Sequence, residues 1–123
     1  MFLNRKDFLG LRDLTAEELE YVLKTAETMK FVIGQKNKKV PHLQGKSVII
    51  LFYDSSARAK LSYELAAQHL SANVVDMMAT PASENRERLQ DMGQLIDQMG
   101  ADFIILRHPM SGAARLLADS VEA

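Results

Sequence analysis

The sequence contains no cysteine among its 123 residues. Disulfide bonds, thiolate nucleophiles and cysteine-based metal sites are therefore excluded, and this composition fits a reducing compartment. No apolar run approaches the ~20 residues that are needed to cross a bilayer. The first seven residues also lack the apolar core of a signal peptide. We therefore expect a soluble, cytoplasmic protein.

Neither sign of charge is in large excess, because 15 lysines and arginines nearly balance 16 acidic residues. A nucleic-acid-binding protein usually carries a basic stripe. The densest basic run here, formed by Lys36, Lys38 and Lys39, is short and typical of a solvated loop. Histidine, aspartate and glutamate do not cluster with metal-ligand spacing. We therefore expect no nucleic-acid partner, no membrane contact and no metal.

Hydrophobic residues make up 47% of the chain, enough for one small domain with a buried core spanning residues 1–123. Thr15-Ala-Glu-Glu18 is a capping box that predicts the start of a helix. Apolar residues recur at helical spacing as far as about Ile33, and Gly34 is predicted to end the helix in a left-handed conformation. A polar loop is expected over residues 36–45.

Strand and helix patterns alternate over the rest of the chain. Three short apolar runs predict buried strands at 47–53, 73–78 and 102–107, the first and third of them central in a sheet. Helices are predicted after residue 56, over about 85–99, and from Pro109 through 113–118, with a loop over 79–84. The residues predicted to face the core from the first two of these helices are Leu61, Leu65, Ala66, Leu70, Leu89, Met92, Leu95, Ile96 and Met99.

This alternation predicts an α/β fold with three layers, in which helices cover both faces of a central parallel sheet through right-handed crossovers. In such sheets, ligands bind beyond the carboxyl ends of the strands. Two segments that follow predicted strands are therefore candidates for a functional site, residues 54–60 and 107–112.

The first candidate segment joins a buried strand to a helix and carries Ser55, Ser56, Arg58 and Lys60. Amides in the first turn of a helix have no internal partners, and the helix dipole adds partial positive charge, so a phosphate can bind there. Arg58 adds a planar fork that suits a phosphate dianion. The alternative is that Ser55 or Ser56 caps the helix while Arg58 and Lys60 lie in solvent, and spacing alone favours it.

The second candidate segment begins with Arg107-His108-Pro109. If its strand lies beside the first, Arg107 and the first segment converge on one crevice, where two arginines would stabilise a doubly charged ligand and a polarised carbonyl. The alternative for Arg107 is an ion pair at the strand end. A lone histidine beside proline is more often structural, and we interpret His108 in this way. His42 and His69 are interpreted as surface or packing residues.

Together the two segments resemble the aspartate and ornithine carbamoyltransferase family. The family motif Phe-x-x-x-Ser-Thr-Arg-Thr-Arg corresponds to residues 52–60, and the Ser-Phe-Glu that follows corresponds to Ser62-Tyr-Glu64. Leu-x-Ala-Asn-Val is found at 70–74, and Arg-His-Pro-x-x-Gly-Ala-Ala-Arg stands complete at 107–115. The latter motif favours the aspartate branch. The opening Leu-x-Asp-Leu-Thr at 11–15 also fits, so the resemblance covers essentially the whole chain.

The resemblance implies transfer of a carbamoyl group from carbamoyl phosphate to the amino group of aspartate, in pyrimidine biosynthesis and without a cofactor. Catalysis would rest on positioning and on stabilising charge at the carbonyl oxygen and the leaving phosphate. Carried over by position, the substrate-binding residues are Ser56, Ala57, Arg58, Ala59 and Arg107, with Arg58 and Arg107 as the catalytic pair. Ser56 and Arg58 would hold the phosphate, and Arg107 would also polarise the carbonyl. A homo-oligomer is expected, a trimer by resemblance.

Three departures from the family pattern weaken the expected site. Ala57 and Ala59 replace two threonines; a hydrogen bond to a charged group is worth roughly 1.5–3 kcal/mol, so binding would weaken by about two to four orders of magnitude. Asn85 stands where the family has a lysine that a neighbouring subunit inserts into the site, with Arg86 beside it. The family's His-Pro-x-x-Gln segment and aspartate-binding domain have no counterpart in these residues.

Two interpretations follow. In the first, the chain is a carbamoyl-phosphate-binding domain that binds phosphate ligands but has no turnover alone, and the intact Arg58 and Arg107 favour it. In the second, it is a non-catalytic domain, natural or engineered, that keeps the fold for assembly, and the three altered positions favour it. A flavodoxin-like signalling module is a weaker third interpretation, because only Asp54 represents the acidic cluster of that class.

Overall fold

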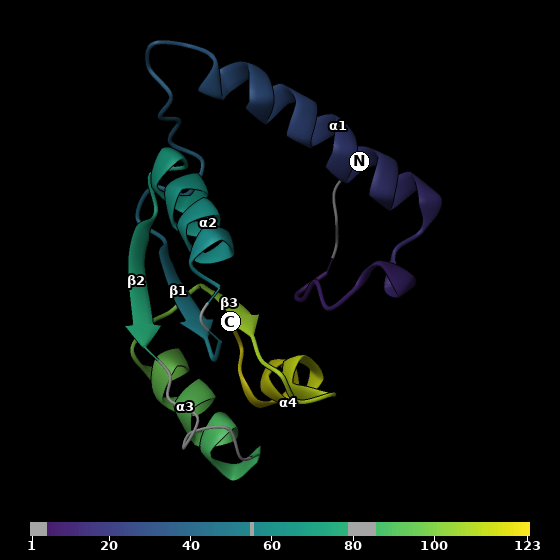
Figure 1. The fold of residues 1–123 in the computed structure, drawn as a ribbon, viewed down its shortest axis with the longest axis vertical. Coiled ribbons are helices and arrows are strands. Elements are labelled where there is room, and N and C mark those ends of the chain that lie inside the picture. Colours follow the sequence, from purple (N-terminus) through teal and green to yellow (C-terminus); the bar gives the residue numbers. More distant parts are fainter. Residues whose placement is uncertain (1–4, 55, 79–85) are drawn as a thin grey trace. The chain divides into compact units, whose positions relative to one another are not determined.

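The computed structural model describes residues 5–54, 56–78 and 86–123 (Figure 1). The chain divides into two compact units, Met1–Lys39 and Val40–Ala123. The expectations for Ser55, for the loop at 79–84 and for Asn85 concern residues outside these described ranges. None of the helices in the described part has both the length and the apolar character of a membrane span.

The N-terminal unit contains a short 3₁₀ helix, η1 (Leu11–Asp13), and the long helix α1 (Ala16–Ile33). The predicted capping box is confirmed: Glu18 N donates to Thr15 Oγ1 over 3.1 Å, and Thr15 N donates to Glu18 Oε1 over 3.0 Å. The predicted end at Ile33 is also confirmed, but the left-handed stop is wrong. Gly34 has φ −79° and closes the last turn through its amide, 3.2 Å from Phe31 O, so a right-handed turn suffices.

An ion pair secures the start of α1. The carboxylate of Glu18 accepts from Arg5 Nε over 2.7 Å and from Arg5 Nη2 over 2.8 Å. These hydrogen bonds, together with the one from the Thr15 amide, lower the pKa of Glu18 to about 2, and burial opposes them only in part. Glu18 is the buried residue of α1, whereas Leu23 and Phe31 are exposed.

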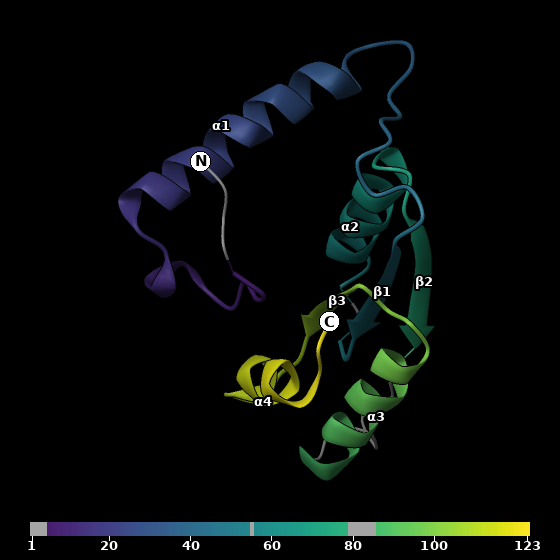
Figure 2. The same cartoon turned by 180° about the vertical axis from the view of Figure 1, so that it is seen from behind.

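The second unit is built on a parallel sheet of three strands, β1 (Ser47–Phe52), β2 (Asn73–Met78) and β3 (Phe103–Arg107). The strand order is β2-β1-β3, so β1 lies in the middle (Figures 1 and 2). Helices α2 (Ala57–His69), α3 (Arg86–Gln98) and α4 (Ala113–Ser120) alternate with the strands. The predicted α/β fold with a parallel sheet is confirmed.

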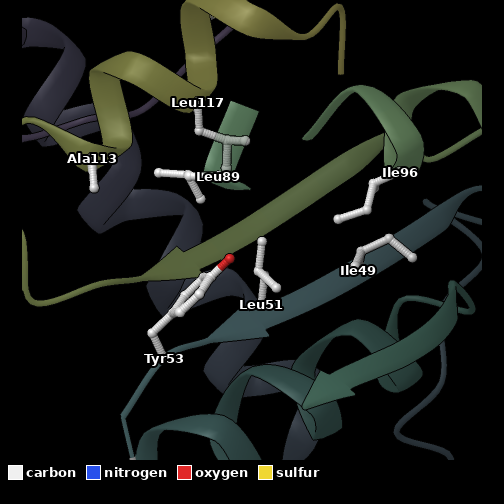
Figure 3. Packing of buried hydrophobic residues seen from close by; sticks show 7 residues of the cluster. All are labelled: Ile49, Leu51, Tyr53, Leu89, Ile96, Ala113 and Leu117. Carbon is white, nitrogen blue, oxygen red and sulfur yellow. The ribbon is translucent and has the colours of Figure 1, made fainter. Parts of the chain in front are cut away.

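Side chains of β1 point alternately to two helical layers. Ile49, Leu51 and Tyr53 pack with Leu89 and Ile96 of α3 and with Ala113 and Leu117 of α4 (Figure 3). On the other face, the Phe52 ring meets Tyr63 of α2 edge-on, with 6.2 Å between the ring centroids. Because β1 is buried on both faces, its run of apolar residues needs no alternation with polar ones.

Several details of the predicted packing are wrong. Leu61 and Leu65 of α2 are 62% and 47% exposed, and the buried residue of that helix is Ala67. In α3, Leu89 and Ile96 are fully buried as predicted, but Leu95 is exposed. Met99, just after that helix, is exposed as well.

The third strand and the fourth helix also differ from expectation. Within the described ranges β3 pairs only with β1, so it is an edge strand rather than a central one, and Phe103 is exposed. Helix α4 begins at Ala113 rather than at Pro109. The amide of Met110 donates to His108 Nδ1 over 3.0 Å, which closes a turn there, and Gly112 then enters α4 with φ 80°.

Candidate anion-binding site

The two candidate segments lie side by side at the carboxyl edge of the sheet. Strands β1 and β3 are parallel neighbours, and Phe52 is the register partner of Arg107. The pairing continues past the end of β1, because Tyr53 N donates to Arg107 O over 2.8 Å. The conditional expectation that the first and third strands are adjacent is therefore confirmed.

The register also assigns Arg107 to a face of the sheet. Residues directly opposite one another on neighbouring strands project to the same side, and Phe52 projects toward α2, where it meets Tyr63. Arg107 therefore leaves β3 on the α2 side. Arg58 lies in the first turn of α2, the helix that covers this side of the sheet. The two arginines therefore lie on the same side of the sheet.

A carboxylate of the chain itself joins the two segments. Asp54 Oδ2 lies 2.5 Å from Arg107 Nε, and the two side chains are 39% and 51% exposed. The second oxygen, Asp54 Oδ1, accepts from Ser56 N over 3.1 Å. Asp54 thus binds both the guanidinium after β3 and an amide at the start of α2. The predicted alternative for Arg107, an ion pair at the strand end, is what the structure contains.

The start of α2 keeps its donors available. Ser56 is the N-cap residue, but its hydroxyl makes no capping hydrogen bond, so the alternative that this side chain caps the helix is wrong. The helical ladder begins with Lys60 N donating to Ser56 O over 3.1 Å. The amides of the three preceding residues have no carbonyl one turn earlier, and the helix dipole is positive there.

The side chains of the first turn of α2 differ in their contacts and exposure. Lys60 forms an ion pair with Asp76 of β2, with Nζ 3.0 Å from Oδ2, so it is neither in open solvent nor part of the candidate site. Arg58 is exposed and has no ion-pair partner among the described residues. Ala57 is exposed and Ala59 is half-buried; neither side chain has a polar group to offer a ligand.

Sequence reasoning missed the role of Asp54. The signal was present, because an aspartate two residues before an amide commonly accepts from it and closes a turn. The pairing with Arg107 could not be deduced in the same way, because 53 positions separate the two residues and only the strand register brings them together.

The fold and this edge define a class: a parallel α/β domain with a helix N-terminus and an arginine at the carboxyl ends of adjacent strands, a location where such sheets bind anions. Residues 6–122 match the family described as aspartate/ornithine carbamoyltransferase, carbamoyl-P binding domain. The chain belongs to this family.

Relatives agree with this membership. The chain is 56% identical over 124 residues to the aspartate carbamoyltransferase catalytic subunit of Acetivibrio thermocellus and 52% identical to that of Ruminiclostridium cellulolyticum. Both alignments include 100% of this chain and 40% of the relative, so the chain spans well under half the length of these proteins.

Solved structures show the same fold. The catalytic subunit of M. jannaschii aspartate transcarbamoylase superposes with a TM-score of 0.81 at 30% identity, over 95% of this chain and 38% of the other. Aspartate transcarbamoylase from Trypanosoma cruzi, solved in complex with phosphate, gives a TM-score of 0.80 over 89% of this chain and 34% of the other. The identity to the T. cruzi protein is 23%, so that likeness concerns the fold alone.

Proposed function

We propose that the chain binds carbamoyl phosphate, or a phosphate-like anion, between the start of α2 and the end of β3. The observation that carries the proposal is the position of Asp54. One carboxylate group binds Arg107 and the Ser56 amide together, so these donors already converge on an oxyanion. A phosphoryl group carries more charge and more acceptor oxygens than a carboxylate, and it would compete for the same donors.

Each residue of the site then has a defined part in the proposal. The Ser56 hydroxyl, the amides of Ala57 and Ala59 and the Arg58 guanidinium would hold the phosphate. Arg107 would exchange Asp54 for the ligand and stabilise negative charge on the carbamoyl oxygen. None of these groups transfers a proton, and no cofactor takes part. The site therefore works by orientation and electrostatic stabilisation.

The complete reaction would need a second component. In carbamoyl transfer to aspartate, the reaction of pyrimidine synthesis that we propose for the complete protein, the amino nitrogen attacks the carbonyl carbon. The bond from that carbon to the phosphate oxygen breaks, phosphate leaves, and the amine loses a proton. The groups described at the sheet edge stabilise charge but include no pocket for aspartate. We therefore propose that the 123 residues bind the donor and have no turnover alone.

Calorimetric titration of the 123-residue chain with carbamoyl phosphate and with phosphonoacetate tests this function. We expect millimolar or tighter binding that Arg107→Ala and Arg58→Ala each abolish. Arg115→Ala is the matched control, because Arg115 is exposed and lies 3.9 Å from Asp119 one turn along α4. Absence of binding, or equal loss in all three variants, would overturn the proposal and favour a non-catalytic domain that keeps the fold for assembly.

We also propose that the chain is cytoplasmic and associates with copies of itself, as a trimer. Large apolar side chains are exposed on several elements, among them Phe31 on α1 and Leu61 on α2, and association would remove such surface from water. Sedimentation velocity over a range of concentrations tests the association. A single monomeric species throughout that range would exclude it.

A further inference from the structure

We propose that His108 is a positioning residue for this anion site, one that fixes the turn after β3 and thereby holds Arg107 beside the start of α2. The inference rests on the proposed function. His108 touches neither the ligand donors nor Asp54 in the proposed arrangement. Its effect on binding would be exerted through the backbone that it shares with Arg107.

Two contacts of the imidazole carry the inference. Its Nδ1 accepts from the Met110 amide over 3.0 Å. Its ring lies against the ring of Tyr53, with 4.5 Å between centroids and 54° between planes. Tyr53 is 5% exposed and belongs to the core cluster with Ala113 and Leu117 of α4 (Figure 3). The turn after β3 is therefore closed locally and anchored to the core by one side chain.

The hydrogen bond also defines the state of the ring. An imidazole nitrogen that accepts carries no proton in that contact, so the hydrogen bond assigns the ring proton to Nε2. That Nε2 atom is buried and has no hydrogen-bond partner among the described residues. The hydrogen bond from the Met110 amide and the packing against Tyr53 together hold the ring. They therefore constrain the backbone at residue 108 in both translation and rotation.

The geometry explains how this constraint reaches Arg107. Successive residues of an extended chain project to opposite faces, so His108 and Tyr53 meet on the α3–α4 side while Arg107 and Asp54 meet on the α2 side. Between these two contacts, Tyr53 N donates to Arg107 O over 2.8 Å. A shift of the His108 ring would turn the peptide that carries Arg107 and move its guanidinium away from α2.

The two turns are also closed in the same way. Asp54 Oδ1 accepts from the amide two residues on, that of Ser56, and His108 Nδ1 accepts from the amide two residues on, that of Met110. An asparagine side chain makes this contact readily. His108→Asn therefore keeps an acceptor for Met110 while it removes the ring, and His108→Phe keeps a ring while it removes the acceptor.

These two variants separate positioning from stability. Phosphonoacetate affinity and urea unfolding are measured for both variants and for the unaltered chain. We expect His108→Phe, which loses the acceptor for the Met110 amide but keeps a ring against Tyr53, to be slightly less stable than the unaltered chain and to bind roughly three- to tenfold more weakly, a change no larger than one net hydrogen bond allows. We expect His108→Asn to be less stable than His108→Phe and yet to bind phosphonoacetate more tightly than His108→Phe does. Affinities that follow the order of the stabilities, or unchanged binding in His108→Phe, would overturn the inference.

A ligand-free measurement keeps this inference separate from the proposed function. Amide hydrogen exchange at Met110 and Tyr53 is followed by NMR in the absence of anion. Faster exchange at both amides in His108→Phe, with Met110 protected again in His108→Asn, supports the positioning role even if no anion binds. Unchanged exchange at both amides in both variants would overturn it. If His108→Phe does not fold, the Met110 amide in His108→Asn decides alone, because loss of its protection contradicts the role of the acceptor.

Discussion

Arg107 and Asp54 form an ion pair across the ends of adjacent strands, with Nε 2.5 Å from Oδ2. Both side chains are partly exposed, so the pair itself adds little to stability. Its importance lies in location, because the same carboxylate also accepts from the Ser56 amide. An anion that binds these donors as proposed must displace Asp54 or share them with it, and that competition would lower its affinity.

Removing the charge of Asp54 should therefore strengthen anion binding. Asp54→Asn keeps an acceptor for the Ser56 amide but no longer repels an anion beside Arg107. Both side chains are partly exposed, and at about 4 Å a like-charge repulsion in water is worth ~1 kcal/mol. We expect phosphonoacetate to bind about three- to tenfold more tightly, with a smaller gain at high salt, as measured by calorimetry.

Asp76→Asn is the control for this prediction, because it removes an aspartate from another ion pair of the same unit, that with Lys60. Its affinity should equal that of the unaltered chain. Weaker binding in Asp54→Asn alone would instead mean that Asp54 orients Arg107 for the ligand, and the competition described above would be excluded.

Restoring hydroxyls to the first turn of α2 should also strengthen binding. Ala57→Thr and Ala59→Thr each place a donor beside amides that already face the proposed phosphate position. One hydrogen bond to a charged group is worth roughly 1.5–3 kcal/mol, so each change should tighten binding about ten- to hundredfold. Ala66→Thr, at an exposed position later in α2, controls for the helix propensity of threonine, a cost below about 1 kcal/mol. If Ala57→Thr, Ala59→Thr and Ala66→Thr all bind phosphonoacetate with the same affinity, the alanines at positions 57 and 59 do not weaken anion binding.

The order of strands and helices could be predicted because its signals are local. The apolar run at Val48–Phe52 and the capping box at Thr15 each lie within a few residues, and both were confirmed. The packing of α2 could not be predicted in the same way. Leu61 and Leu65 have helical spacing, but the helix meets the sheet through Ala67 and Tyr63, so the stripe of leucines remains exposed.

The same distinction, between features with local signals and features that depend on distant residues, applies to the candidate site. The convergence of the segments after β1 and β3 followed from the general behaviour of parallel sheets. The partner of Arg107 depends on the register of Phe52 with Arg107, which determines that Asp54 is within reach. Register is a property of the assembled sheet. Only the structure therefore shows that Asp54 already accepts from Arg107 and from the Ser56 amide.

The contact between α3 and α4 depends on the absence of a side chain at Gly93. A Cβ atom at this position would lie 2.5 Å from Leu117 Cδ1 and 3.0 Å from Val121 Cγ1. Leu117 is buried and cannot move freely. Overpacking costs about 1–3 kcal/mol, and the better helix propensity of alanine offsets at most ~1 kcal/mol. We expect Gly93→Ala to be less stable by about 1 kcal/mol in urea unfolding.

A second substitution tests the cause of that loss. Leu117→Ala removes the side chain with which a Cβ atom at position 93 would clash, and it leaves a cavity there. In that background Gly93→Ala should be neutral or stabilising, so the two changes should be strongly non-additive. Additive effects would show that the α3–α4 contact is not the reason for glycine at this position.

The stability of the N-terminal unit should depend on acidity through Glu18. Hydrogen bonds from Arg5 and from the Thr15 amide lower its pKa from the ordinary value of 4.5 to about 2. A carboxyl group whose pKa is lower in the folded state contributes stability that is fully present above pH 4.5 and is lost as the pH falls from there toward 2. The protection of the α1 amides against hydrogen exchange, measured relative to the intrinsic exchange rate at each pH, should therefore fall over this interval. Glu18→Gln should flatten the profile, because the ionic contact with Arg5 is already absent at neutral pH. Glu17→Gln, at an exposed position in the same turn, should retain the pH dependence of the unaltered chain, and equal profiles for the two variants would rule out Glu18 as its source.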